Sequence, residues 1–248
     1  MSSEKDVLEK ATHNALKVMK NAGFEIPDKL EVMVDPKLPF MGYSTKRRGG
    51  DVIVISGMAL KSGMIEGLLI HEMSHIYRTN THHPSHNSRL LDRAVKLIAQ
   101  KARLTRNYQI AVFRQAINHI QDLYADDVAF RAFGKSEAFP PDQAFNFFLS
   151  WINDKPVDSS DAESVWLNVG IMLSNCFALS NMVRHNVPDV NDQAEKNAQK
   201  FLSQTSMPIR EGFLYFKTFM TGLKEEVTEK EFEEMLIDYL TRITELAK

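Results

Sequence analysis

The stretch DVIVISGMALKSGMIEGLLIHEMSHIYR, residues 51–78, predicts a strand followed closely by a helix. Asp51–Ser56 is the clearest strand pattern in the chain, because it is rich in β-branched residues and ends at Gly57. A helix is expected from about Ser62 to Arg78, and the residues on either side of its polar run at 71–75 are uncharged. These features are typical of a helix that is largely buried.

Upstream of this stretch, the sequence predicts one helix and one further strand. Apolar residues recur at helical spacing over 4–22, and Gly23 suits the end of that helix. Leu30–Val34 has the pattern of a short strand before Pro36, and the glycine-rich segment 37–50 is expected to be a loop or a hairpin connection. The sheet is therefore expected to be small.

Downstream of the stretch, the sequence predicts almost only helix. After a His- and Asn-rich loop at 80–87, helices are expected at about 88–103, 107–133, 142–152, 162–186, 190–204, 208–222 and 228–247. This order favours an α+β fold with a small N-terminal sheet, followed by a mostly α-helical C-terminal half. The boundary between the two parts is expected near residue 135.

Composition is that of an ordinary globular protein and excludes few functions. Of the 248 residues, 44% are hydrophobic and 25% are charged, which is enough for a packed core. The net charge of −2 gives no argument for nucleic acid or a membrane surface as partner. Cys176 is the single cysteine, so an intramolecular disulfide is excluded, and the residues after Met1 show no secretory signal. A cytoplasmic protein is therefore expected.

One segment is long and apolar enough to be compared with a membrane span. Ser164–Val183 carries no formal charge over twenty residues. It nevertheless contains Asn168, Asn175 and Asn181 together with several serines, and such groups are costly at bilayer depth without partners. The segment is expected to be a buried core helix.

The residues that carry chemistry are His71-Glu72-Met73-Ser74-His75. On a helix, positions i and i+4 lie on one face about a turn apart, so both imidazoles can bind one metal ion. Glu72 lies about 100° around the helix from His71, where it can reach a metal-bound water without being a ligand. The alternative is that both histidines are ordinary surface or core residues with no metal.

Zinc suits this pattern because two neutral imidazoles and one carboxylate leave a tetrahedral position open for water. The metal lowers the pKa of that water toward neutrality, and Glu72 is expected to take its proton as the water attacks a carbonyl. The expected cofactor is therefore Zn²⁺, and the expected reaction is hydrolysis.

The HExxH motif of His71 to His75, lying after a strand, resembles the zincin metallopeptidases. The metzincin branch would need glycine at 78 and histidine at 81, where this chain has Arg78 and Thr81. The gluzincin branch is more similar. Its second helix often carries E-x-x-A-D-x-x-A, and residues 122–129 here read DLYADDVA, with aspartate in place of the usual glutamate. The resemblance covers roughly residues 30 to 134.

This resemblance implies a role for each matching residue. His71 and His75 would be metal ligands, Glu72 the catalytic base, Asp122 the third ligand, and Asp126 the partner that hydrogen-bonds a ligand histidine. Aspartate is one methylene shorter than glutamate, so the helices would have to approach more closely. Other residues remain open as the third ligand, and they are all histidines: His82, His83, His86 and His119.

The first hypothesis is a cytoplasmic zinc-dependent metallopeptidase that acts on a peptide or protein. Residues 1–135 would form the zincin-like catalytic domain, and residues 136–248 an α-helical domain that completes the cleft. An extended substrate is expected to pair with an edge strand, for which Asp51–Ser56 is the candidate. Candidates for stabilising the oxyanion come from the helical part, namely Tyr108, His185, Arg210 and Tyr215.

Two other classes of function remain open. One is a zincin-like protein that binds metal without proteolytic activity and acts as a regulatory or interaction module. The other is a helical binding protein in which the HExxH pattern is accidental. Metal content separates the last from the first two, and the effect of Glu72→Gln separates a peptidase from a non-catalytic metal-binding protein.

Overall fold

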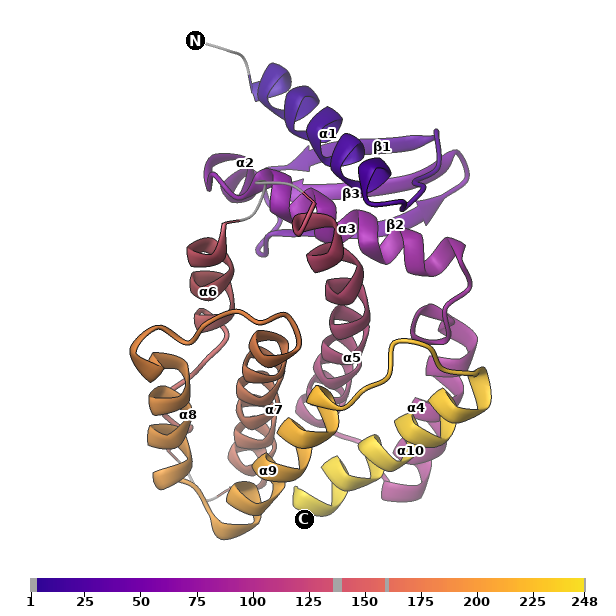
Figure 1. Cartoon of the computed structure of the whole chain (residues 1–248). Coiled ribbons are helices and arrows are strands. Elements are labelled where there is room, and N and C mark those ends of the chain that lie inside the picture. The colour runs from indigo at the N-terminus through magenta and orange to yellow at the C-terminus, as the bar shows by residue number, and fades with distance from the viewer. Residues whose placement is uncertain (1–3, 136–139, 159–160, 248) are drawn as a thin grey trace. The chain divides into compact units, whose positions relative to one another are not determined.

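A computed structural model of the protein describes residues 4–135, 140–158 and 161–247 (Figure 1). The strands are β1 (Leu30–Asp35), β2 (Gly42–Arg47) and β3 (Gly50–Ser56). The helices are α1 (Glu4–Asn21), α2 (Gly57–Lys61), α3 (Ile65–Asn80), α4 (Ser88–Ala102), α5 (Asn107–Phe133), α6 (Pro141–Leu149), α7 (Ala162–Arg184), α8 (Gln193–Ser203), α9 (Met207–Thr221) and α10 (Glu229–Leu246). Short 3₁₀ turns lie at Pro84–His86 and Val190–Asp192.

The chain forms two compact units, and α5 belongs to both. The mixed unit comprises residues 1–83 and 124–143, and the helical unit comprises residues 84–123 and 144–248. This division differs from the expected boundary near residue 135. The reason is that the first part of α5, with α4 before it, packs among the later helices, whereas its last part completes the core beneath the sheet.

The sheet of the mixed unit has the strand order β1-β3-β2. β1 is parallel to β3, whereas β2 is antiparallel to it. Asp51–Ser56 are all buried, as expected for the strand that is paired on both sides. The expectation that Asp51–Ser56 is an edge strand is therefore wrong, because β1 and β2 form the edges of this sheet.

β2 lies within the segment that was expected to be a loop or a hairpin connection. Its sequence GYSTKR has no apolar alternation and its residues are only partly buried, so pairing with β3 rather than side-chain pattern forms the strand. Gly50 begins β3 with a φ of 146°, and a Cβ there would collide with the carbonyl oxygen of Lys29. The turn between the two strands therefore needs glycine at this position.

The core of the mixed unit is made by α1, α3, the sheet and the last part of α5. α1 and α3 pack against each other, and α3 also contacts β2 and β3 (Figure 1). Met19, Ile55, Leu69 and Met73 are completely buried in this core. Because α3 is held on three sides, the polar residues of its HExxH segment have a defined position.

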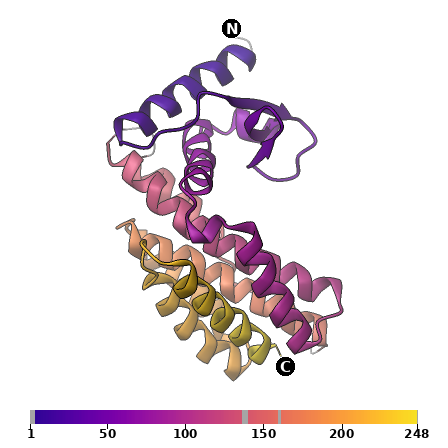
Figure 2. The ribbon, with the colours of Figure 1, turned by 90° about the vertical axis from the view of Figure 1, so that its right-hand side faces the viewer.

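The helical unit is built around α7, which packs along α9, and around α10, which packs along α4 (Figure 1, Figure 2). α10 begins with a capping box in which Thr228 and Glu231 satisfy each other's backbone N–H groups. Aromatic side chains fill the interior of the unit, and Phe201, Phe216, Phe232 and Tyr239 are among the fully buried ones. The small N-terminal sheet and the helical C-terminal half together confirm the α+β class.

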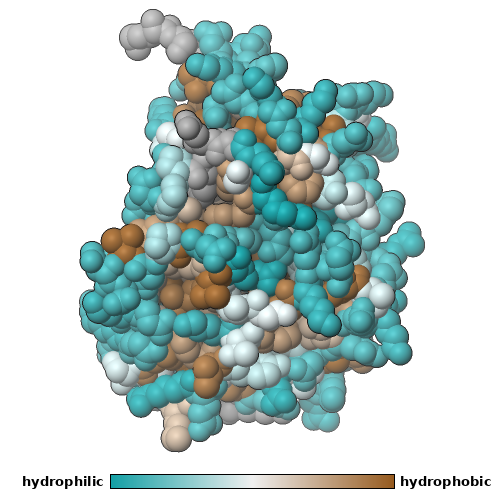
Figure 3. Space-filling view, in the orientation of Figure 1, coloured by the Kyte–Doolittle hydropathy of each residue, from teal (hydrophilic) through white to brown (hydrophobic). Residues whose placement is uncertain are grey.

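α7 is long and apolar enough to cross a membrane by length and composition alone. Within its most apolar 18-residue window, 83% of the helix is buried inside the protein. Most of the face visible in the space-filling view is hydrophilic (Figure 3). Burial of this kind is what the core helix of a globular unit shows, as expected for Ser164–Val183.

Candidate metal centre

α3 places His71 and His75 one turn apart on the same face. Their Nε2 atoms are 3.1 Å from each other, and both residues are partly exposed. The two rings meet edge to face, with centroids 4.7 Å apart. Two imidazole nitrogens at this separation need a proton or a metal cation between them, because two lone pairs would repel each other.

Asp126, on α5, determines which nitrogen of His71 carries the proton. Its Oδ1 lies 2.8 Å from Nδ1 of His71, and Asp126 is only 3% exposed. An ionised carboxylate only accepts hydrogen bonds, so Nδ1 of His71 donates to it, and in the neutral ring Nε2 then keeps the lone pair. This lone pair is the one that lies beside His75. Metal-binding histidines in proteins are oriented by the same kind of carboxylate contact.

Asp122 lies one turn before Asp126 on the same unbroken helix. One ligand atom each from His71, His75 and Asp122 lie within 4.8 Å of one another, and the three residues form a group that could bind a metal ion. Two atoms bound tetrahedrally to zinc at its usual bond lengths are about 3.3 Å apart. The two Nε2 atoms, at 3.1 Å, are already close to that separation.

Glu72 is buried beside this group. It is 5% exposed, and its carboxylate makes no hydrogen bond or ion pair with any residue in the described part of the chain. A buried carboxylate without a partner is unfavourable unless a cation or an ordered water compensates for it. The position next to His71 therefore fits a group that works beside a bound cation.

Arg78 and His83 hold α3 against α5 within the mixed unit. Nε of Arg78, which is 4% exposed, donates to the carbonyl oxygen of Tyr124 over 2.9 Å. The ring of His83 lies on the ring of Tyr124 with centroids 4.7 Å apart. Sequence analysis did not assign this role to Arg78, although a charged residue one turn after His75 on a largely buried helix is the signal that could have indicated it.

The end of α3 is also tied to the sheet. Nδ2 of Asn80 donates to Asp51 over 3.1 Å, and Nζ of Lys46 donates to Oδ1 of Asn80 over 3.3 Å. Asp51 lies on β3 and Lys46 lies on β2. The C-terminal end of the HExxH helix is thus bonded to β2 and β3.

The remaining candidate ligands lie elsewhere. His82 is exposed with a left-handed backbone, His83 packs on Tyr124, and His86 approaches Ser85 with Nδ1 and Oγ 2.8 Å apart. His119 is buried in the helical unit, where its ring stacks on Phe177. Among the described residues, none of these four histidines belongs to a metal-binding group.

Most of the residues that were candidates for stabilising the oxyanion either have hydrogen-bond partners of their own or lie several helical turns from Asp122. Arg210 donates to the carbonyl oxygens of Ser203 and Thr205 at the end of α8, over 3.2 and 3.1 Å. Tyr215 donates to Asp238 over 2.6 Å, and burial together with this carboxylate raises the pKa of Tyr215 to about 12. Tyr108 lies in the first turn of α5, about four turns before Asp122. Burial lowers the pKa of His185, just after α7, to about 3.

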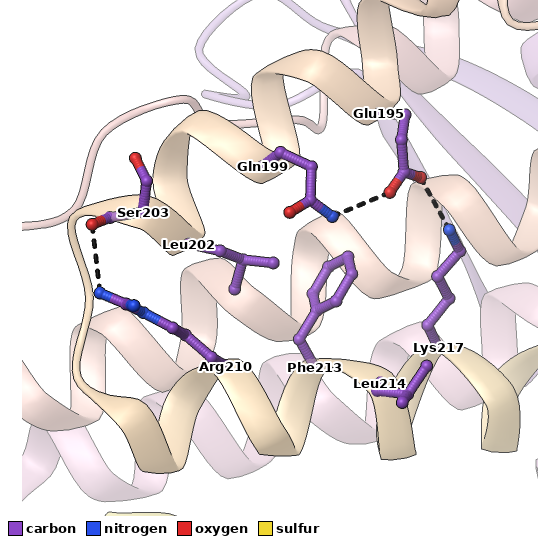
Figure 4. Close-up of a pocket in the computed structure, with 8 residues that line it drawn as sticks. All are labelled: Glu195, Gln199, Leu202, Ser203, Arg210, Phe213, Leu214 and Lys217. Atoms are coloured by element: carbon purple, nitrogen blue, oxygen red, sulfur yellow. Dashed lines mark hydrogen bonds and ion pairs between the residues drawn. The ribbon is translucent and has the colours of Figure 1, made fainter.

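A concave region with a volume of about 390 Å³ lies between α8 and α9. Figure 4 shows that the polar side chains around it bond to one another. Lys217 pairs with Glu195 over 2.7 Å, Gln199 donates to the same carboxylate, and Arg210 bonds to the backbone of Ser203. Its polar groups thus bond to one another or to the backbone.

Fold and site define an α+β protein with a buried HExxH helix and a His-His-Asp group that could bind a metal ion. The chain belongs to DUF5781, a family of unknown function that matches residues 18–244. No curated protein and no solved structure matches it.

Proposed function

We propose that the protein is a zinc-dependent metallopeptidase with His71, His75 and Asp122 as ligands. The observation that carries the proposal is the bond between Asp126 and Nδ1 of His71, which leaves Nε2 of His71 facing Nε2 of His75. A carboxylate in this position serves a histidine that binds metal, because it fixes both the tautomer and the ring orientation.

Zinc is the ion that suits this donor set. Two neutral imidazoles and one carboxylate are a ligand set of catalytic zinc sites, whereas magnesium and calcium prefer oxygen ligands. Zinc bound there would supply a Lewis acid that lowers the pKa of water toward neutrality and polarises a carbonyl. The same ion would compensate for the buried charge of Glu72.

Glu72 is the general base in this proposal. It follows His71 directly and is not a member of the ligand group, so its carboxylate is available to take a proton from the attacking water. The same carboxyl group can then pass the proton to the leaving amine. The residue is 5% exposed, so most of its side chain is enclosed by the protein.

The proposed substrate is an extended peptide that pairs with β2. This strand is an edge of the sheet and contacts α3, the helix that carries the HExxH motif. Phe40 and Tyr43, at the start of the strand, are 51% and 37% exposed, with ring centroids 6.1 Å apart. Backbone pairing along the edge would hold the peptide, and the two exposed rings would contact its apolar side chains.

A non-catalytic metal-binding protein is the second candidate. Arg210 donates to backbone carbonyls, and Tyr215 donates to Asp238. These bonds favour the second candidate, because neither side chain is then available to stabilise an oxyanion. Such a protein would keep the metal and hydrolyse nothing.

The test starts from protein purified without a histidine tag. We expect about one zinc per chain by elemental analysis, and new peptide termini when the protein is incubated with a mixture of unstructured peptides and analysed by mass spectrometry. Zinc without cleavage would support the non-catalytic candidate. Absence of metal after incubation with excess zinc would contradict both.

A further inference from the structure

Three buried asparagines lie along α7, and only two of them are used to hold the fold. Asn168 bonds to the backbone of Val157 through both amide atoms, over 2.7 and 3.1 Å. Asn175 does the same with Asn153, over 2.8 and 3.0 Å. Asn181 is 0% exposed, and neither atom of its amide has a hydrogen-bond partner among the residues that the structure describes. Asn181 thus lacks the structural role of the other two.

A histidine on α5 has the same unusual property. His119 is 1% exposed, and within the described part of the chain neither of its ring nitrogens has a hydrogen-bond partner. Its ring stacks on Phe177, with centroids 4.8 Å apart, and meets the edge of Trp151 at 5.8 Å. Burial lowers the pKa of His119 to about 4, so the ring is neutral and offers one N–H donor and one acceptor.

The register of α5 and α7 places Asn181 about one turn beyond the level of His119. Gln115 donates to Ser174 over 2.7 Å, and one turn further His119 stacks on Phe177, so the two helices run parallel here. Asn181 lies two turns after Ser174 on the same face of α7. The corresponding position on α5 is that of Asp122 and Leu123. Every residue in this comparison belongs to the helical unit.

By this register, Asp122 lies one turn beyond His119 on α5 and at the level of Asn181 on α7, and neither of these polar groups bonds to a described residue. His119 is three residues before it, a spacing at which side chains on a helix meet. The negative charge of Asp122 also acts on the His119 ring. Unpaired polar groups in a core are costly, and apolar residues of the same shape would be more stable there. Where proteins keep such groups, a functional site is the common reason.

We propose that His119 and Asn181 are positioning residues that hydrogen-bond the Asp122 carboxylate when a metal ion is bound. The inference rests on the proposed zinc site. One oxygen of Asp122 binds the ion, and the other accepts hydrogen bonds from the imidazole N–H and the amide NH₂. Carboxylate ligands usually have such partners, which orient them and tune their affinity for metal. An aspartate, shorter than the glutamate it resembles, depends more on them to stay in reach.

The test uses substitutions that keep shape and remove hydrogen bonding. His119→Phe retains the aromatic stack, and Asn181→Leu retains the volume. We expect each to weaken zinc binding by about 10- to 100-fold in competition with a chromophoric chelator. The melting temperature of the metal-free protein should stay the same or rise. With cobalt(II) in place of zinc, the visible absorption bands should shift, because the carboxylate ligand is reoriented.

Asn175→Leu is the matched control on the same helix. It removes an asparagine that is equally buried but fully bonded, so we expect a lower melting temperature and unchanged zinc affinity. His119→Gln keeps a donor and should recover part of the affinity that His119→Phe loses. A structural role for His119 or Asn181 would instead lower stability and leave the cobalt spectrum unchanged.

The outcomes separate this inference from the proposed function. If the wild-type protein binds zinc and both His119→Phe and Asn181→Leu bind it within twofold as tightly, the positioning role is wrong and the metal site stands. If the wild-type protein binds zinc but cleaves no peptide, the peptidase activity is wrong and the positioning role stands. If the wild-type protein binds no zinc, both proposals are wrong.

Discussion

Two sets of histidines lie within sixteen residues of each other in the sequence. They differ in their secondary structure and in the contacts that their side chains make. His71 and His75 are on a helix, with one imidazole fixed by Asp126. His82, His83 and His86 lie just after that helix, where His83 packs on a ring and His86 contacts the adjacent Ser85. The comparison teaches that the number of imidazoles does not make a metal site. In the proposed site, a helix and the hydrogen bond from His71 to Asp126 position the imidazoles.

The largest expected effect is on zinc content, and it should distinguish the helix histidines from the loop histidines. His71→Ala or His75→Ala removes a ligand, and we expect stoichiometric zinc to be lost, as measured by elemental analysis after dialysis. His82→Ala and His86→Ala should each keep about one zinc per chain. Loss of zinc in a loop variant, with Asp122→Ala still binding normally, would move the third ligand into the loop.

Glu72→Gln should remove activity without removing metal. The amide cannot take a proton from water, whereas the three ligands are unchanged, so we expect hydrolysis to fall by at least about 100-fold. Zinc content and peptide cleavage should be measured on the same preparation. Cleavage at the wild-type rate would show that another residue is the base.

Substitutions of Asp122 and Asp126, both on α5, should weaken zinc binding to different extents. Asp122→Ala removes a ligand oxygen and should weaken zinc binding steeply. Asp126→Asn keeps an acceptor but loses the charge that orients His71, so a loss of about 10- to 100-fold is expected. Chelator competition measures both. Equal affinities for Asp126→Asn and the wild type would mean that the bond to Nδ1 does not orient a ligand.

His119 belongs to neither set of histidines. We expect it to change how the free energy of unfolding depends on pH. Its pKa is lowered to about 4 by burial, so the folded state holds the neutral ring and the stability it contributes is lost as the pH falls from about 6.5 toward 4. The full shift corresponds to about 3 kcal/mol. Metal-free His119→Phe should therefore lose less stability than the wild type between pH 7 and pH 4.5 in urea unfolding. Parallel losses would show that the ring is not buried in its neutral form.

The smallest effect is expected from His83. His83→Ala removes the contact with the Tyr124 ring, so we expect a loss of about 1 kcal/mol in the free energy of unfolding. Zinc affinity should change little, because His83 is not in the ligand group. Thermal unfolding with and without zinc measures both quantities.

The sequence allowed the local elements to be predicted better than their partners. Asp51–Ser56 and the helix after it were predictable because apolar periodicity is a local property. β2 was not, because GYSTKR becomes a strand only through backbone pairing with β3. For the same reason the central position of β3 was missed. Sheet order depends on contacts between distant residues, which no local pattern contains.

The candidate site shows a similar contrast. The spacing of His71 and His75 is visible in the sequence, and resemblance to the gluzincins drew attention to Asp122 and Asp126. The bond from Arg78 to the Tyr124 carbonyl is not visible, because a backbone acceptor leaves no mark in the sequence. Neither is the difference between Asn175 and Asn181, which have the same side chain in the same helix and differ only in what faces them.

The mixed unit is built from two separate segments of the chain, so its two parts are synthesised at different times. Residues 1–83 leave the ribosome with both histidines of the motif, but the unit is completed only by residues 124–143. At a translation rate of about 5–20 residues per second, the interval between His75 and Asp126 lasts about 3–10 seconds. Over most of that interval neither Asp122 nor Asp126 has been made. If the proposed zinc site is correct, the nascent chain can offer an ion only the two imidazoles of the motif until α5 has been synthesised.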